Sequence, residues 1–221
     1  MIKGIIFDFD GVLIDSEHIN IAAGVRAFKE FGYELSTDDK KLIPGQHSEN
    51  IVSQILELRD LSLPKEALLK RYSEIYGGVW ENMVTVMPHV TETLQRLKND
   101  GIVLGLATNN RRLRVEIFLR QTGLGNIFSA IVSGEDVVKR KPDPEIYVEA
   151  KTRLGLPDKS ILAVEDGVIG FMAAKRAGLQ CAVVLNQYSA GQDFSSADFV
   201  FKTLADLMDH LTEKKLLDKI S

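Results

Sequence analysis

The residues best suited to chemistry in this sequence are four carboxylates, one hydroxyl and one lysine. They are Asp8, Asp10, Thr108, Lys141, Glu165 and Asp166. Each has an ordinary structural interpretation when taken alone, because acidic and hydroxyl residues are common in loops and at helix N-termini. The carboxylates and the threonine, however, all follow short apolar runs, at the same end of each run. This joint pattern favours a functional site.

These residue types are suited to phosphoryl transfer. Clustered carboxylates repel one another unless a cation is present, and a small number of hard oxygen ligands favours Mg²⁺. A carboxylate near Mg²⁺ and a lysine stays ionised and can attack phosphorus, while a second carboxylate two residues along the chain can transfer a proton. A threonine hydroxyl and backbone N–H groups can hold the phosphoryl oxygens, whose charge a lysine offsets.

The elements that must bring these residues together are those of a parallel α/β sheet. Strands are predicted over 2–7, 102–107, 130–132, 160–164, 181–185 and 198–201. Helices are predicted over 90–98, 111–121, 144–154 and 168–177, and at the end of the chain. Alternating strands and helices indicate a parallel sheet, in which ligands bind at the carboxyl ends of the strands. We therefore expect a Rossmann-like sheet with the site along one edge.

A block of helical sequence interrupts this pattern directly after the first strand. No strand signal occurs within it, and Ser16 and Ser48, both common N-cap residues, are predicted to begin two of its helices. We expect an α/β catalytic core formed by residues 1–14 and 85–221, with an inserted helical cap formed by residues 15–84.

Composition and charge exclude several classes of protein. The 221 residues are 45% hydrophobic with a formal net charge of −4, which excludes a disordered chain and argues against a nucleic-acid binder. No apolar run is long enough to cross a membrane, and acids interrupt the N-terminal run, which argues against a secretion signal. The single cysteine, Cys181, favours a reducing compartment. We expect a cytoplasmic monomer with no nucleic-acid or membrane partner.

Four segments of the sequence resemble the motifs of the haloacid dehalogenase superfamily of phosphohydrolases and phosphomutases. They are FDFDGV at 7–12, LATN at 106–109, KPDPEIY at 141–147 and VEDG at 164–167. The resemblance extends from residue 4 to about 185, and it is closest to the branch of sugar phosphatases and β-phosphoglucomutase-like enzymes. It implies a helical cap, inserted after the first strand, that closes over the site and excludes bulk water.

The resemblance implies catalytic roles for four residues. Asp8 is the expected nucleophile, which forms an aspartyl-phosphate. Asp10 is the expected general acid/base, and Thr108 and Lys141 are expected to bind the phosphoryl group.

It also implies a metal site and further substrate contacts. Asp166 is expected to bind Mg²⁺ directly, together with Asp8 and the backbone carbonyl of Asp10, and Glu165 is a ligand or a neighbour of the ligands. Gly11 and Asn109, from the first and second motifs, are expected to contact the substrate.

Three residues of the predicted cap are candidates for binding the substrate. His18 lies near the predicted hinge, and Gln46 and His47 follow Gly45 in a predicted loop. Each also has a structural interpretation, as a polar position on a helix face or in a solvated loop. The cap is expected to decide which substrate is bound.

We expect Mg²⁺-dependent hydrolysis of a small phosphorylated metabolite, a sugar or polyol phosphate, and the alternative is phosphomutase activity. The mutases carry a histidine where this chain has Asn20, and a cap arginine where it has Ser48. Such an arginine would hold a second phosphate, so its absence favours water as the acceptor.

Two other classes of protein share part of this pattern. Receiver-type signalling modules also combine an acidic Mg²⁺ site with a threonine and a lysine on a parallel sheet. They are shorter, lack the helical insertion and carry the phosphorylated aspartate after a later strand. A true dehalogenase needs neither Mg²⁺ nor an acid two residues beyond its nucleophile, so Asp10 argues against that activity.

Overall fold

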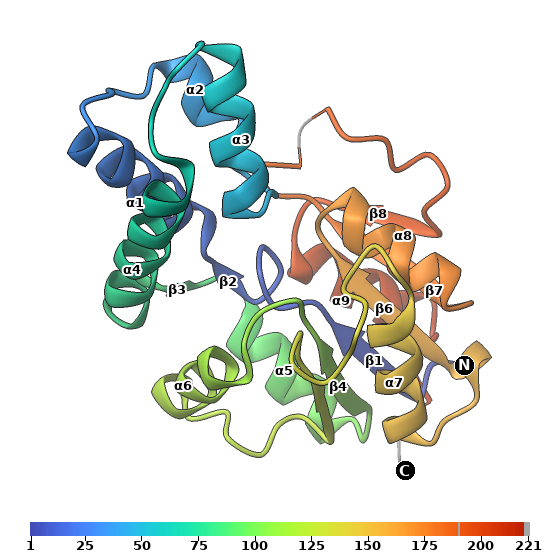
Figure 1. Cartoon of the computed structure of the whole chain (residues 1–221). Helices are drawn as coiled ribbons and strands as arrows, with labels where there is room; N and C mark the ends of the chain where they lie inside the picture. Colours follow the sequence, from blue (N-terminus) through green and yellow to red (C-terminus); the bar gives the residue numbers. More distant parts are fainter. Residues whose placement is uncertain (190, 219–221) are drawn as a thin grey trace. The chain divides into compact units, whose positions relative to one another are not determined.

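The chain divides into two compact units (Figure 1). The computed structural model describes residues 1–189 and 191–218, without the side chains of 81–83. Unit 1 comprises Met1–Ile14 and the described residues from Val86 onwards, and unit 2 comprises Asp15–Thr85.

Unit 1 is built on a parallel sheet that has six strands within the described residues. They are β1 (Gly4–Phe7), β4 (Val103–Ala107), β5 (Ala130–Val132), β6 (Ile161–Glu165), β7 (Gln180–Val184) and β8 (Phe199–Phe201). Their order is β5-β4-β1-β6-β7-β8. β4 and β5 lie on one side of β1, and β6, β7 and β8 lie on the other. The order of the strands therefore reverses between β1 and β6. In open α/β sheets this reversal marks the place where ligands bind.

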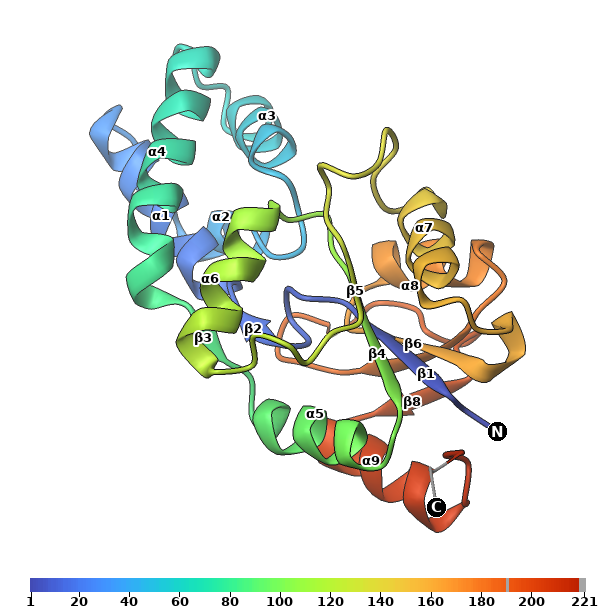
Figure 2. The same cartoon turned by 90° about the horizontal axis from the view of Figure 1, so that it is seen from below.

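Helices cover both faces of this sheet (Figure 2). The helices of unit 1 are α5 (Val90–Asn99), α6 (Arg112–Thr122), α7 (Glu145–Leu154), α8 (Val168–Arg176) and α9 (Leu204–Glu213), and η1 (Asp158–Ser160) is a short 3₁₀ helix. α5 and α9 pack together over one face, and α7 and α8 over the other. Because both faces are covered, β1 is apolar and buried along its whole length, as is typical of parallel sheets.

The register of the central strands aligns their carboxyl ends. Phe7 of β1 pairs with Leu106 of β4 and with Val164 of β6. Asp8, the next residue, continues this alignment because its backbone N–H donates to the Val164 carbonyl at 2.9 Å. Thr108 directly follows β4. The register therefore places the first, second and fourth sequence motifs at one edge of the sheet.

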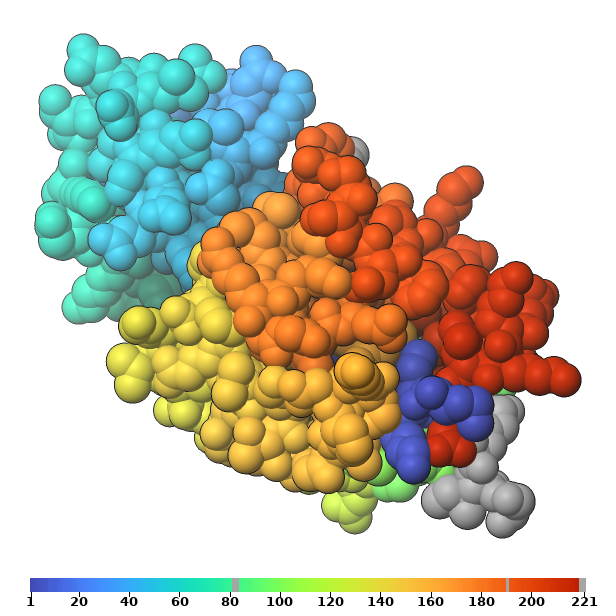
Figure 3. All heavy atoms as spheres, turned by 90° about the vertical axis from the view of Figure 1, so that its right-hand side faces the viewer, coloured from blue at the N-terminus to red at the C-terminus, as the bar shows by residue number. Residues whose placement is uncertain are grey.

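The two ends of unit 1 are tied together. Ile2 forms an isolated parallel bridge with Leu217, and Lys3 pairs with Asp218 at 3.3 Å. Figure 3 shows the first residues, in blue, beside the last described residues, in red. No helix among the described residues is both long enough and apolar enough to span a membrane.

Unit 2 is built mainly of helices joined by short loops. Its helices are α1 (Glu17–Glu30), α2 (Thr37–Lys41), α3 (Ser48–Leu58) and α4 (Lys65–Met83). α1, α3 and α4 share one apolar cluster that includes Phe28, Ile51, Ile55, Leu68 and Tyr72. These side chains recur three or four residues apart within each helix, which is the spacing of one buried helix face.

The chain passes between the two units at a pair of very short strands. β2 (Ile14–Asp15) and β3 (Thr85–Val86) form a separate two-stranded sheet. The sequence pattern did not predict them, because two residues are too few to show an alternating pattern.

The predicted Rossmann-like parallel α/β fold is confirmed, and one predicted helix start needs correction. Ser16 is the N-cap of α1, but its side chain makes no capping hydrogen bond. Its backbone lies in the helical region, with φ −101° and ψ −11°, instead of the extended region in which N-cap side chains reach the first turn. α3 begins one residue earlier than predicted, because His47 is its extended N-cap residue and Ser48 is already helical.

Candidate active site

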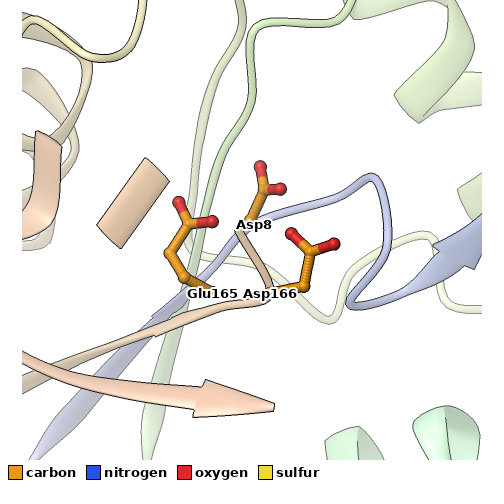
Figure 4. A group of neighbouring side chains, drawn as sticks. All are labelled: Asp8, Glu165 and Asp166. Atoms are coloured by element: carbon orange, nitrogen blue, oxygen red, sulfur yellow. The ribbon is translucent and has the colours of Figure 1, made fainter. Parts of the chain in front are cut away.

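Three carboxylates converge at the point where the strand order reverses. Asp8 follows β1, and Glu165 and Asp166 lie at the end of β6, the strand next to it. Figure 4 shows all three carboxylates pointing into the same space. Each offers one oxygen that lies within 4.8 Å of the others. The edge of the sheet predicted to hold the site thus carries a compact group of oxygen donors.

Lys141 is the cation nearest to this group. Its side chain is 4% exposed, and its Nζ donates to Asp8 Oδ1 at 2.7 Å, to Glu165 Oε1 at 2.7 Å and to the Ala107 carbonyl at 2.8 Å. An ammonium group has three N–H donors, so these contacts use all of them. Lys141 is therefore held in one position between two carboxylates and a backbone carbonyl.

Glu165 is fixed by a second donor from α7. The hydroxyl of Tyr147 donates to Glu165 Oε1, the same oxygen that accepts from Lys141. A Cβ at Gly170 of α8 would lie 2.1 Å from Glu165 Oε2, so only glycine leaves room for this carboxylate. The sequence predicted Glu165 at the site and placed Tyr147 at the end of the third motif, but it did not indicate that Tyr147 and Gly170 are neighbours of Glu165.

Burial dominates the electrostatics of this cluster. It raises the pKa of Asp8 well above its ordinary value, the charge of Glu165 adds to the rise, and Lys141 opposes it. Burial disfavours the charge of Lys141 as well, but Asp8 and Glu165 outweigh it and hold the lysine pKa above its ordinary value. Lys141 therefore stays protonated, and the carboxylates around it outnumber the positive charges.

Asp166 is held by the loop that follows β7. Asn186 Nδ2 donates to Asp166 Oδ2 at 2.7 Å and to the Gly11 carbonyl at 3.2 Å, and Ser189 Oγ donates to the Asp166 carbonyl at 2.6 Å. Gly11 has φ +77°, and a Cβ there would lie 1.9 Å from Asp166 Oδ2. The glycine thus lets the first and fourth motifs approach closely.

Asp10 faces the loop after β4. Its carboxylate accepts two hydrogen bonds from Asn110 Nδ2, both at 3.1 Å, and a long contact of 3.5 Å from Thr108 Oγ1. Thr108 is fully buried and Asp10 is partly exposed. The predicted acid/base residue and the predicted phosphoryl-binding hydroxyl are therefore neighbours in the structure.

A comparison with protein families agrees with this geometry. The family model for haloacid dehalogenase-like hydrolases matches residues 5–184, which include every motif described above. The chain belongs to the haloacid dehalogenase-like hydrolases. The resemblance predicted from the four motifs is thereby confirmed at the level of the family.

Individual haloacid dehalogenase-like proteins resemble this hydrolase over most of its length. The CbbY protein of Rhodobacter capsulatus is 32% identical, covering 90% of this chain and 92% of its own. A phosphorylated carbohydrates phosphatase of Thermotoga maritima is 31% identical, and the match covers 80% of this chain and 82% of the relative. A crystal structure of a mutant CbbY from Rhodobacter sphaeroides, in complex with xylulose-1,5-bisphosphate, matches with a TM-score of 0.77 and 27% identity. The match covers 94% of this chain and 96% of that one.

The donor set of this hydrolase fits a small, hard cation. All three candidate ligands are carboxylates, and such oxygen donors suit Mg²⁺ better than a softer metal. Burial and the neighbouring carboxylates raise the pKa of Asp8, and a cation beside it would counter both effects. Asp8 and Asp166 would hold the ion, with Glu165 as a third oxygen donor beside them.

Two predicted substrate contacts are already engaged within unit 1. Asn109 Oδ1 accepts from the Lys141 backbone N–H at 2.9 Å, and Asn109 Nδ2 donates to the Lys141 carbonyl at 3.3 Å. The backbone N–H of Gly11 donates to the Ile14 carbonyl at 2.8 Å. Asn109 thus holds the backbone of Lys141 in place, and a direct substrate contact from either residue stays a prediction.

The remaining predicted substrate contacts belong to unit 2. His18 Nδ1 lies 3.4 Å from Asp15 Oδ1. Gln46 Nε2 donates to the Leu42 carbonyl at 2.8 Å, and His47 is the exposed N-cap of α3. Their roles in substrate binding stay predictions.

Sequence reasoning missed three residues that hold site groups: Tyr147, Asn110 and Asn186. Asn186 is the second residue after β7 and the first polar one, so the rule used for the other strand ends would have found it. Asn110 directly follows the Thr108-Asn109 pair. Tyr147 ends the third motif, but the motif gave it no role, and a tyrosine on a buried helix face is ordinarily a core residue.

Proposed function

We propose that this protein is a Mg²⁺-dependent phosphatase that hydrolyses a small phosphorylated sugar or polyol through an aspartyl-phosphate on Asp8. The observation that carries the proposal is the place of Asp8, at the strand-order reversal, with Lys141 Nζ 2.7 Å from its Oδ1. A carboxylate beside a fixed ammonium group, within a ring of oxygen donors, can attack a phosphoryl group whose charge is neutralised.

The first proposed step transfers the phosphoryl group to the protein. Asp8 forms a new P–O bond as the bond between phosphorus and the leaving oxygen breaks, and that oxygen takes a proton from Asp10. The Thr108 hydroxyl holds a phosphoryl oxygen during the transfer, and the charge of the nearby Lys141 offsets the negative charge of the phosphoryl group. Mg²⁺, held by Asp8 and Asp166, would supply further positive charge at this site.

The second proposed step returns Asp8 to its starting state. Water attacks the aspartyl-phosphate and gives a proton to Asp10, and the bond between phosphorus and the Asp8 oxygen breaks to release inorganic phosphate. Asp10 therefore donates a proton in one step and accepts one in the next, as a single general acid/base can.

The substrate class is supported by the relatives. The CbbY structure holds a sugar bisphosphate, and the Thermotoga maritima relative is named for phosphorylated carbohydrates. We propose that unit 2 contributes specificity, through His18, Gln46 and His47. Alanine substitution of each should change the ratio of kcat/KM values between two sugar phosphates more than it changes hydrolysis of a small aryl phosphate.

The proposal is tested by phosphate release from a panel of sugar, polyol and glycolytic phosphates. Each reaction is run with Mg²⁺ and with EDTA, and is followed by phosphorus NMR with Asp8→Asn as the control. Mg²⁺-dependent release from a few related compounds is the expected result. No release from any compound at any metal concentration would contradict the phosphatase, and movement of phosphate between carbons without release would replace it with the mutase alternative.

A further inference from the structure

The carboxylate of Asp10 is held by the side-chain amide of Asn110. Asn110 Nδ2 lies 3.1 Å from each of its two oxygens. A bifurcated contact of this kind fixes both the distance and the tilt of the carboxylate plane, whereas the single contact from Thr108 Oγ1, at 3.5 Å, is too long to do so.

The orientation of the Asn110 amide is itself determined. Its Oδ1 accepts from Arg114 Nη1 at 2.9 Å and from the Arg111 backbone N–H at 2.9 Å. Both partners can only donate, so the oxygen end of the amide must face them and the NH₂ end must face Asp10. The Asn110 backbone N–H also donates to Thr108 Oγ1 at 2.9 Å, which fixes the backbone of this loop.

Such a fixed amide matters because proton transfer depends on where the Asp10 carboxylate stands. Asp10 is partly exposed and lies in the turn after β1. A carboxylate that is free to rotate meets the leaving oxygen in only a fraction of its conformations, and proton transfer requires an approach of about 3 Å.

We propose that Asn110, itself held by Arg114, is a positioning residue that sets the Asp10 carboxylate for proton transfer to the leaving oxygen. This inference rests on the proposed function and adds a specific dependence to it. Asn110 acts through Asp10, so its contribution depends on how strongly the leaving group needs a proton.

The test compares two substrates that differ in this need. A p-nitrophenolate leaves readily without a proton, whereas the alkoxide of glycerol phosphate or of a sugar phosphate does not. The quantity measured is kcat/KM, because it reports the steps up to transfer of phosphate to Asp8 and excludes the later attack by water. For Asn110→Ala we expect kcat/KM to fall about tenfold to a hundredfold with the alkyl phosphate. With p-nitrophenyl phosphate it should fall by less than about threefold.

Two arginines on the same helix provide a matched pair of variants. Arg114→Met removes the contact to Asn110, whereas Arg112→Met removes a contact to Asp136 at 2.8 Å. Arg114→Met should reproduce the selective loss on the alkyl phosphate in weaker form, and Arg112→Met should show no selectivity. Asp10→Asn provides the upper limit of the selective loss.

The outcomes separate this inference from the proposed function. Equal losses on both substrates, or a rise in KM alone, would show that Asn110 contacts substrate or supports the fold, and would overturn the inference while leaving the phosphatase intact. A wild-type protein inactive on every phosphate would contradict the proposed function instead. In that case a crystal structure still tests the inference. An Asn110 amide turned away from Asp10 would overturn it, whatever the activity of the protein.

Discussion

Each unit buries a carboxylate that accepts hydrogen bonds from a basic residue and from a tyrosine, but the charges balance differently. In unit 2, Asp39 accepts from Arg59 Nε at 2.8 Å, from Tyr33 at 3.0 Å and from the backbone and hydroxyl of Ser36, both at 2.8 Å. In unit 1, Asp8 and Glu165 share the single ammonium group of Lys141.

The two arrangements shift carboxylate pKa values in opposite directions. Burial opposes the charge of Asp39, but hydrogen bonds from Arg59, Ser36 and Tyr33 outweigh it and lower its pKa to about 2. At Asp8 burial prevails and the pKa is raised. The comparison shows that the cluster in unit 2 is complete without a ligand, whereas the cluster in unit 1 has an excess of negative charge that a cation would relieve. The following substitutions test this difference.

Asp8→Asn should have the largest effect on activity and should not lower stability. Loss of the nucleophile should lower kcat roughly 10⁴-fold or more. The free energy of unfolding, measured with denaturant in the absence of divalent cations, should stay the same or rise, because one of the repelling charges is removed. More than trace activity would contradict covalent catalysis at Asp8, and a large loss of stability would contradict the excess charge.

Lys141→Met should damage both properties. The phosphoryl group loses its fixed cation, so kcat/KM should fall about 10²- to 10³-fold. Two buried carboxylates are left without a counter-charge, which should lower the free energy of unfolding by about 3 kcal/mol. Arg59→Met in unit 2 is the matched control and should lower stability alone. A Lys141→Met protein with normal stability would show that solvent already compensates the charges of Asp8 and Glu165.

Asp39→Asn should lower stability without affecting phosphoryl transfer. The neutral amide places an NH₂ group against donors that now lack an acceptor, at a cost of about 2 kcal/mol at pH 7. Denaturant unfolding measures this loss, and kcat on p-nitrophenyl phosphate measures the chemistry. Equal losses of stability in Asp8→Asn and Asp39→Asn would remove the distinction between the two clusters.

The advantage of wild type over Asp39→Asn should depend on pH. The pKa of Asp39 is lower in the folded protein, at about 2, than in the unfolded chain, where it is about 3.9. Its charged form therefore stabilises the fold fully above about pH 4, and this contribution disappears as the pH falls through about 2. Unfolding free energies of both proteins between pH 7 and pH 2 should converge, and a constant difference would contradict the lowered pKa.

Removing the two tyrosine hydroxyls should give the smallest effects. Tyr33→Phe and Tyr147→Phe each delete one hydrogen bond to a buried carboxylate and should each cost about 1 kcal/mol of stability. Only Tyr147→Phe should also lower kcat/KM, because Glu165 then holds Lys141 less firmly. Loss of activity in Tyr33→Phe as well would contradict the separate roles of the two clusters.

Much of unit 1 could be predicted because its pattern is local in the sequence. Short apolar runs that alternate with helical periods specify a parallel sheet, and the polar residues after Phe7, Ala107 and Val164 mark its functional edge. The contacts of Asn186 with Asp166 and of Tyr147 with Glu165 escaped prediction because each joins elements that lie apart in the sequence and depends on side-chain direction.

Unit 2 could be predicted as helical but not in its contacts. Apolar periodicity defines its helices, whereas the burial of Asp39 depends on a capping box with Ser36 and on Arg59, which lies 20 residues away. Nothing in the sequence pattern distinguishes such a buried acid from an exposed one. The substrate contacts of His18, Gln46 and His47, the monomeric state and the cytoplasmic location stay predictions.

The pairing of β2 with β3 has a consequence for how this chain can change. The two ends of the insertion lie on neighbouring strands, so their spacing is that of a sheet, about 4.8 Å. A replacement segment of any length therefore needs only to present two adjacent ends, and no strand of the six-stranded sheet has to be reordered. Residues 15–85 thus form an exchangeable cassette, both for evolution by insertion and for the construction of chimaeric enzymes.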